Sequence, residues 1–283
     1  MDLRISELQD IIRLCNLKRC RLDIDLSPLN RIIKHRTEEF LVTVETGITF
    51  GALQQQLKNQ RFPLTYHPDR TLANILAENP SSLTHNKPLP HWVVGIEAIT
   101  GDGEYIHYGG EVVKNVTGYD MAKLFIGSGN RFGVPVSVTL KLVTQPEASH
   151  TFLFHTPSLE EAMQVAKLLG QSLHTIEMLV VFRTNTTFGW HLLLVLTGYS
   201  ELVLMDKEAV LTLICGLDPQ LQDLNASDKV LNQWIQKLDG NPSAEVLLPL
   251  APTRVTKQEV SPVFERWQSR LKAQFDPNQV LPC

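Results

Sequence analysis

The sequence predicts an α+β protein of two domains, in which the second domain carries an antiparallel sheet. Its 283 residues provide room for about two domains of roughly 100–200 residues each. Strand-like and helix-like runs are mixed without a regular strand–helix repeat, which is typical of α+β rather than α/β proteins. The polar segment Gln145–His150 separates two parts with different element order, so we expect domains over 1–148 and 149–283.

The chain opens with a helical pattern followed by a strand pattern. Apolar residues between Leu3 and Leu14 recur near every 3.6 residues, and Ser6 with its acidic neighbours is suited to begin a helix. Leu22–Leu26 alternates apolar and acidic side chains, which predicts a half-buried strand. Ser27–Asn30 then has the composition of a turn.

The next elements are a strand and two short helices. Phe40–Glu45 alternates and predicts a strand. A helix is expected over Thr49–Leu57, with the Thr49 hydroxyl as its N-cap. Another is expected over Leu72–Ala77, and Asn79 followed by proline ends it.

The first domain is expected to end in strands around a hairpin. Val93–Thr100 and Glu104–Tyr108 flank Gly101-Asp102-Gly103, a strong hairpin signal. Val134–Val143 alternates more clearly than any other run in the chain and predicts a central strand.

The second domain is expected to pack helices on one face of an antiparallel sheet. Its helix at Ser158 begins with a capping box, since a glutamate follows three residues later. The expected elements are strands at Thr151–His155, Ile176–Arg183 and Trp190–Thr197, and helices at Ser158–Gly170, Glu201–Leu217 and Val260–Phe275.

Composition excludes several classes of protein. The 26 basic and 30 acidic residues give a net charge of −4, which argues against a nucleic-acid-binding protein. Cys15, Cys20, Cys215 and Cys283 are scattered without metal-ligand spacing, as expected for reduced thiols of a cytoplasmic protein with no metal site. The charged N-terminus does not resemble a signal peptide, and no apolar run is long enough to insert into a membrane.

A glycine-punctuated block between Gly109 and Gly133 is the most informative part of the chain. Four glycines in it, at 118, 127, 129 and 133, would let backbone N–H groups approach a ligand closely. A helix expected to start near Asp120 would direct its positive end toward the same loop. A pair of tight turns without a ligand would have the same composition, so spacing alone leaves both interpretations open.

The same block resembles a known family. The runs Val113–Asp120, Lys123–Ser128, Phe132–Val134 and Val138–Leu142 together resemble the signature of FAD-binding oxidoreductases of the vanillyl-alcohol oxidase and p-cresol methylhydroxylase type. Lys-Asn-Val-x-Gly-Tyr-Asp is characteristic of the flavin-binding subunit of bacterial three-subunit glycolate oxidase. Shorter matching pieces are Asp25–Arg31, Val42–Thr49, Thr71–Asn74 and Phe275–Asn278.

The resemblance implies a fold, a cofactor and partners. The fold would be a two-subdomain FAD-binding module over 1–148, followed by a cap, or substrate, domain over 149–283, whose residues 262–283 return to the first domain. FAD would accept a hydride from a small 2-hydroxy acid such as glycolate. Electrons would then pass to other subunits, a second flavoprotein and an iron–sulfur protein, and these subunits could hold a cytoplasmic protein at a membrane.

The resemblance also implies which residues face the cofactor. Carried over from the matching motif, these residues are Asn115, Gly118, Tyr119, Gly127, Ser128, Gly133 and Val134. No catalytic residue is assigned. Nine histidines offer possible bases near neutral pH, and of these His174 and His191 in the cap domain are the better placed.

Three departures from the family concern the flavin. The family's glycine-rich pyrophosphate loop is missing, because Leu14–Arg21 joins the first helix to the next strand without a glycine. Both family glycines are replaced within Thr71–Asn74. The family's Ser-Gly and Arg-x-Gly-x-x-x-Asp runs, which should follow, are absent from Pro80–His91. A diphosphate needs several converging N–H groups, so the alternative is a catalytically silent structural subunit that has lost FAD and keeps the fold for assembly.

Overall fold

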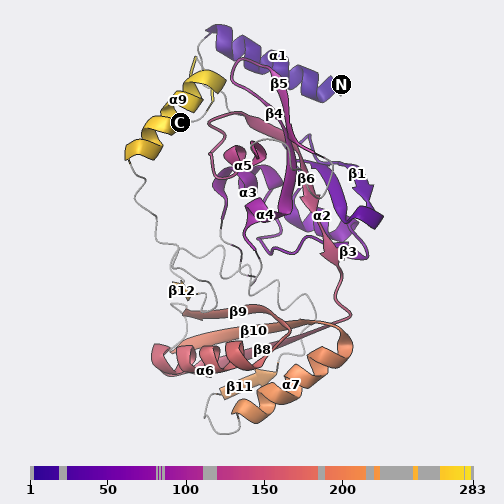
Figure 1. Ribbon diagram of the computed structural model, residues 1–283, viewed down its shortest axis with the longest axis vertical. Coiled ribbons are helices and arrows are strands. Elements are labelled where there is room, and N and C mark those ends of the chain that lie inside the picture. The colour runs from indigo at the N-terminus through magenta and orange to yellow at the C-terminus, as the bar shows by residue number, and fades with distance from the viewer. Residues whose placement is uncertain are drawn as a thin grey trace.

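The computed structural model describes residues 3–18, 24–80, 82, 84, 87–110, 120–183, 189–214, 220–223, 245–247, 262–276 and 278–281. The chain folds around two five-stranded antiparallel sheets, which lie at opposite ends of the long axis (Figure 1). We call the elements from α1 to β7 together with α9 the first unit, and those from β8 to β12 with α6 and α7 the second unit.

The first unit is built on the sheet with strand order β1-β2-β6-β4-β5. The strand predicted from alternation is present as β6, the central strand, which pairs with β2 and β4 and is buried on both faces rather than on one. The strands are β1 (Ile32–Arg36), β2 (Leu41–Glu45), β4 (Val93–Ile99), β5 (Tyr105–Gly109) and β6 (Val134–Lys141), with the short pair β3 (Gln60–Arg61) and β7 (Val143–Thr144) beside them.

Short helices pack around this sheet, and the N-cap predicted at Thr49 is confirmed. The Thr49 hydroxyl accepts a hydrogen bond from the Ala52 N–H, and the Thr71 hydroxyl accepts one from Asn74. Asn79 ends its helix in the left-handed conformation. The helices are α1 (Leu3–Lys18), η1 (Thr37–Glu39), α2 (Phe50–Gln56), α3 (Leu72–Glu78), α4 (Leu89–Trp92) and α5 (Ala122–Phe125).

The last helix, α9 (Pro262–Phe275), packs on the first unit (Figure 1). The Phe275 ring lies 6.4 Å from Phe125 and 6.1 Å from Phe132, measured between centroids. Gly101 of the hairpin donates its N–H to the Phe275 carbonyl. The chain end therefore lies against the first sheet.

Four sequence expectations for the first unit need correction. Ile24–Leu26 is not a strand, because the Asp25 carboxylate accepts hydrogen bonds from the Ser27 N–H and hydroxyl and so forms a local turn. Helix α1 begins at Leu3 rather than Ser6, since Ile5 already packs into the core. The helix expected from Asp120 is a single turn, which the left-handed Gly127 follows.

The fourth correction concerns β1, which the sequence did not indicate. This edge strand is largely exposed and does not alternate, so its side chains carry no periodic signal.

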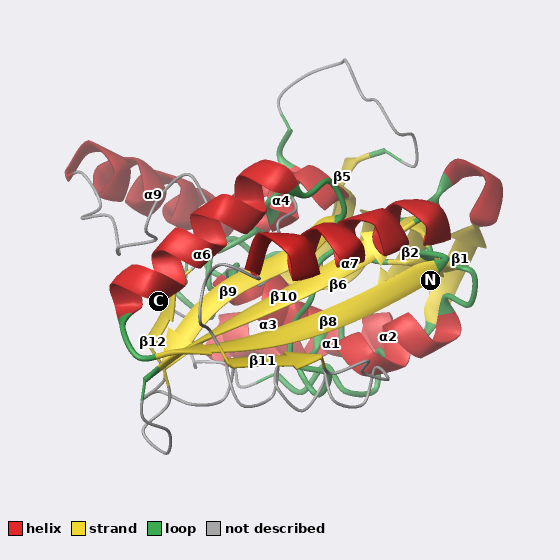
Figure 2. Ribbon diagram, turned by 90° about the horizontal axis from the view of Figure 1, so that it is seen from below, coloured by secondary structure: helices red, strands yellow, loops and turns green. Residues whose placement is uncertain are grey.

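The second unit packs two helices on one face of the sheet with order β11-β8-β10-β9-β12. Both helices lie in front of the sheet in Figure 2, and Figure 1 shows that this is the side away from the first unit. The capping bond predicted at Ser158 is present, from the Glu161 N–H. The elements are β8 (Ala148–Thr156), α6 (Leu159–Ser172), β9 (Ile176–Arg183), β10 (Trp190–Gly198), α7 (Ser200–Ile214), β11 (Gln220–Asp223) and β12 (Glu245–Leu247).

The segment expected as a linker is shorter than its composition suggested. Strand β8 begins at Ala148, because Ala148 and His150 already pair with Gly198 and Leu196 of β10. The domain limits at 148 and 149 stay a prediction. Among the described residues, no helix is both long and apolar enough to cross a membrane.

Candidate functional site

The glycine segment Gly127–Val134 joins α5 to β6. It holds the four predicted cofactor-facing residues that the structure describes: Gly127, Ser128, Gly133 and Val134. The other three, Asn115, Gly118 and Tyr119, lie outside the described residues. The predicted set is therefore brought together in part, and its contact with a cofactor stays a prediction.

The backbone donors of this segment are used inside the protein. The Gly127 N–H donates to the Leu76 carbonyl over 2.7 Å, and the Gly129 N–H donates to Ala77 over 3.0 Å. Gly133 donates to Asn130 over 3.4 Å. A phosphate needs free converging N–H donors, so these glycines pack the loop onto the end of α3 rather than form a phosphate cradle.

Asn130 gives the segment a different chemical character. It adopts the left-handed conformation, with a φ of 63°. Its buried side-chain oxygen, Oδ1, has no hydrogen-bond partner among the described residues. At the preceding residue, Gly129, no described atom lies within 4 Å of the position that a Cβ would take. A buried acceptor without a partner is normally satisfied by a donor from ordered water or from a ligand. Sequence reasoning missed Asn130, although an Asn between two glycines is typical of a left-handed turn.

The N-terminus of α3 is closed at the point where two family glycines are replaced. The Leu72 N–H donates to the Ile48 carbonyl, and the Ala73 N–H donates to the Thr46 carbonyl over 2.7 Å. Ala73 is buried in the cluster formed with α1. The described residues therefore leave one unpaired buried acceptor at Asn130 and provide no free N–H pair for a phosphate at the N-terminus of α3.

The better placed histidines lie in different environments. His174 is 84% exposed and 3.5 Å from the Asp206 carboxylate. His191 is buried on β10, and its ring lies 4.9 Å from His155 and 5.2 Å from Phe182. Burial, and secondly the neighbouring His155, lower the pKa of His191. A neutral imidazole can accept a proton, so His191 has the protonation state that a base requires.

Strand alternation places His191 on the face that looks toward the first unit. Its neighbour Leu192 packs into the cluster under α6 and α7, so His191 points to the opposite face of the sheet. The helices cover the side away from the first unit (Figure 1). Among the described residues no three His, Cys, Asp or Glu side chains gather as a metal site would require.

A cleft lies between the two units. It has a volume of about 620 Å³. Asn59 and Arg61 line it from the first unit, and His174, Glu177 and Tyr199 line it from the second. Of the predicted cofactor-facing residues, the four that the structure describes do not line it.

Comparison with known sequences bears on this arrangement. Residues 19–109 match the sequence model of a family described as "FAD binding domain". The chain is 43% identical over 148 residues to glycolate oxidase subunit GlcE of Escherichia coli, which is 51% of this chain and 41% of that protein. It is 28% identical over 144 residues to glycolate oxidase subunit GlcD of Bacillus subtilis (48% of this chain, 30% of that protein).

A third relative is named for a different hydroxy acid. D-2-hydroxyglutarate dehydrogenase of Xanthomonas citri pv. viticola is 28% identical over 150 residues, 51% of this chain and 32% of that protein. The matched stretches thus cover less than half the length of each of these relatives.

Solved structures share the fold. Alkyldihydroxyacetonephosphate synthase superposes with a TM-score of 0.67 at 12% identity, over 82% of this chain and 52% of that one. A substrate-bound p-cresol methylhydroxylase superposes with a TM-score of 0.63 at 15% identity, over 87% of this chain and 61% of that one. The predicted α+β fold class is confirmed.

Proposed function

We propose that this protein is the FAD-binding subunit of a glycolate oxidase-like complex. The chain contains an FAD-binding domain of the p-cresol methylhydroxylase type, which supports this proposal. Its substrate would be a small 2-hydroxy acid such as glycolate. Its partners would be a second flavoprotein and an iron–sulfur protein. The observation that carries the proposal is the 43% identity over 148 residues to a glycolate oxidase subunit, in a chain whose residues 19–109 match the FAD-binding domain model.

The chain's own residues would bind and orient rather than carry electrons. Bound FAD would supply the hydride acceptor. The Asn130 Oδ1 atom, which has no partner among the described residues, would accept a hydrogen bond at the adenine end. His191, on the face of the second sheet that looks toward the first unit, holds a neutral imidazole that could take the proton of an α-hydroxyl group.

A second candidate function is supported by a specific observation. The N–H groups of Leu72, Ala73, Gly127 and Gly129 are all bonded within the protein. Losing two charge-assisted hydrogen bonds of about 1.5–3 kcal/mol each would weaken flavin binding by at least a hundredfold. A structural subunit that assembles with the partners and binds no FAD would fit this bonding pattern.

Flavin binding separates the two candidates. The purified full chain is examined for the yellow flavin absorption band and titrated with FAD while flavin fluorescence is followed. The flavoprotein predicts saturable binding, and bleaching of the absorption band when glycolate is added without oxygen. A colourless protein that leaves the fluorescence of FAD unchanged would contradict the first proposal and support the structural subunit.

A further inference from the structure

The apolar cores of the two units are separate. In the described part of the chain, no apolar cluster contains residues of both units: two clusters belong to the first unit and one to the second. Hydrophobic contact is the usual means of fixing one domain against another. The relative position of the described parts must therefore depend on other contacts.

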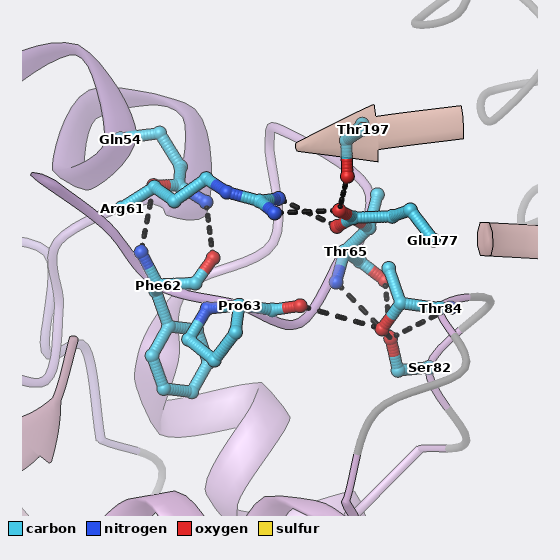
Figure 3. A network of polar contacts seen from close by, with 9 residues as sticks. All are labelled: Gln54, Arg61, Phe62, Pro63, Thr65, Ser82, Thr84, Glu177 and Thr197. Carbon is cyan, nitrogen blue, oxygen red and sulfur yellow. Dashed lines mark hydrogen bonds and ion pairs between the residues drawn. The ribbon is translucent and has the colours of Figure 1, made fainter. Parts of the chain in front are cut away.

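A bidentate ion pair crosses from one unit to the other. Arg61, at the end of β3, places Nη1 2.5 Å from Oε1 and Nη2 2.5 Å from Oε2 of Glu177 on β9 (Figure 3). The arginine side chain is 21% exposed and the glutamate side chain 7% exposed. The Thr197 hydroxyl donates to the same carboxylate. Two parallel bonds fix direction as well as distance, which a single lysine contact would not do.

The arginine side of the pair is rigidly held. Arg61 pairs with Val143 in the short β3–β7 ladder. The Gln54 side chain donates to the Phe62 carbonyl over 2.9 Å and accepts from its N–H over 3.1 Å. The Thr84 hydroxyl donates to the Pro63 carbonyl, and Ser82 joins Thr84 to Thr65 (Figure 3). These bonds leave the backbone around Arg61 little freedom to follow a moving partner.

The pair lies at the edge of the cleft between the units. Both of its residues line the cleft, together with Asn59 and Pro63 on one side and His174 and Tyr199 on the other. The cleft, of about 620 Å³, already has room for water, so the pair is hydrated as soon as its two sides separate. Breaking one partner of a buried pair leaves the other charge without compensation, which favours such hydration.

We propose that Arg61 and Glu177 form a latch that sets how the second unit lies on the first and keeps the cleft narrow. They are positioning residues, because they hold the two units and not a substrate. The consequence for catalysis rests on the proposed function: in a flavoprotein the latch would hold the second sheet over the cofactor-binding unit.

Spin labels across the cleft test the latch directly. Labels are attached at Asn59→Cys and Tyr199→Cys, one exposed residue from each unit, in a full chain whose native cysteines are replaced by serine. The distance between them is measured by double electron–electron resonance. We expect a narrow distribution in the parent, and a broader one at longer distance in Arg61→Ala and in Glu177→Ala.

The chain offers a matched control. Arg70 and Glu78 also form an ion pair at 2.5 Å, but both residues belong to the first unit. Arg70→Ala should leave the distance distribution as it is in the parent. Arg61→Lys, which keeps the charge and loses the fork, should give an intermediate width.

The outcome that overturns the latch is a distribution that Arg61→Ala and Glu177→Ala leave unchanged. If alanine variants do not fold, Glu177→Gln replaces them, since it keeps the shape and removes the charge. The measurement needs no flavin. A protein that fails to bind FAD but shows the broadening would contradict the proposed function and support the latch. A protein that binds FAD but shows no broadening would support the proposed function and contradict the latch.

Discussion

Asn130 combines a left-handed backbone conformation with a buried side-chain oxygen that has no partner among the described residues. Its φ of 63° is a conformation that Asn and Gly tolerate at small cost and other side chains adopt rarely. A buried acceptor without a partner costs free energy, so in a native protein it is expected to meet a ligand or ordered water. This is the physical basis for assigning Asn130 to the adenine end.

Asn130→Gly is the corresponding substitution, because it keeps the left-handed backbone and removes only the amide. Loss of one neutral hydrogen bond of about 1 kcal/mol should raise the Kd for FAD about fivefold, with little change in the free energy of unfolding. FAD is titrated by fluorescence. Asn79→Gly is the control, since Asn79 has a similar φ but ends α3. An unchanged Kd in Asn130→Gly would remove Asn130 from the site.

His191 makes stability depend on pH. Burial and the neighbouring His155 lower its pKa, whereas in the unfolded chain it titrates near 6.5. Below that pH the unfolded chain binds the extra proton, so the contribution of His191 is complete above about 6.5 and is lost as the pH falls.

His191→Phe should therefore reduce the loss of stability between pH 7 and pH 5. The free energy of unfolding is measured in urea at both values. His174→Gln, at an exposed histidine, should retain most of the parent's loss. A loss in His191→Phe equal to that of the parent would mean that His191 is not the titrating group.

At the scale of elements, the chain end after α9 is held by one carboxylate. Asp276 is 1% exposed, and its two oxygens accept the N–H groups of Val280 and Leu281 over 2.8 and 3.0 Å. Lys272 lies 3.4 Å from the same carboxylate. These bonds fold the end back so that Leu281 packs into the cluster with α1. Local hydrogen bonds thus join the two ends of the chain.

Asp276→Ala leaves two buried N–H groups without an acceptor and should lower the free energy of unfolding by about 2–5 kcal/mol. Thermal unfolding with denaturant titration measures the change. Asp120→Ala breaks an exposed pair with Lys123 at 2.9 Å and should cost less than about 1 kcal/mol. Equal effects of the two substitutions would show that the carboxylate does not anchor the chain end.

At the scale of the whole molecule, the apolar clusters formed by the described residues of the two units are separate, so we expect a substitution in one core to leave the other unaffected. Leu53 is fully buried in the first unit and Leu194 in the second, in clusters with no common member. Mutations at distant sites without shared partners usually add.

Leu53→Ala and Leu194→Ala should each lower stability by about 2–5 kcal/mol. In the double variant their effects should add within about 0.5 kcal/mol. Guanidinium unfolding of the parent, the single variants and the double variant measures this. A coupling clearly larger than that would mean that the two cores interact through contacts beyond the ion pair.

Local patterns predicted much of the fold. The threonine cap of α2, the serine cap of α6 and the alternation of β6 all act within a few residues, so the sequence shows them directly. Elements that depend on distant partners were missed. Strands β11 and β12 become strands by pairing with β8 and β9 at the two edges of the second sheet.

Some features of the candidate site could likewise be predicted from the sequence, and others could not. The amino-acid sequence alone determined the FAD-binding segment and showed the replaced glycines at Thr71–Asn74, because these are properties of residue type and order; the cofactor-facing set stays a prediction. Only the tertiary structure decided where the N–H groups of Gly127 and Ala73 donate, that His191 lies beside His155, and that Arg61 meets Glu177. Such contacts join residues far apart in the chain, and it is packing, which no local pattern encodes, that brings them together.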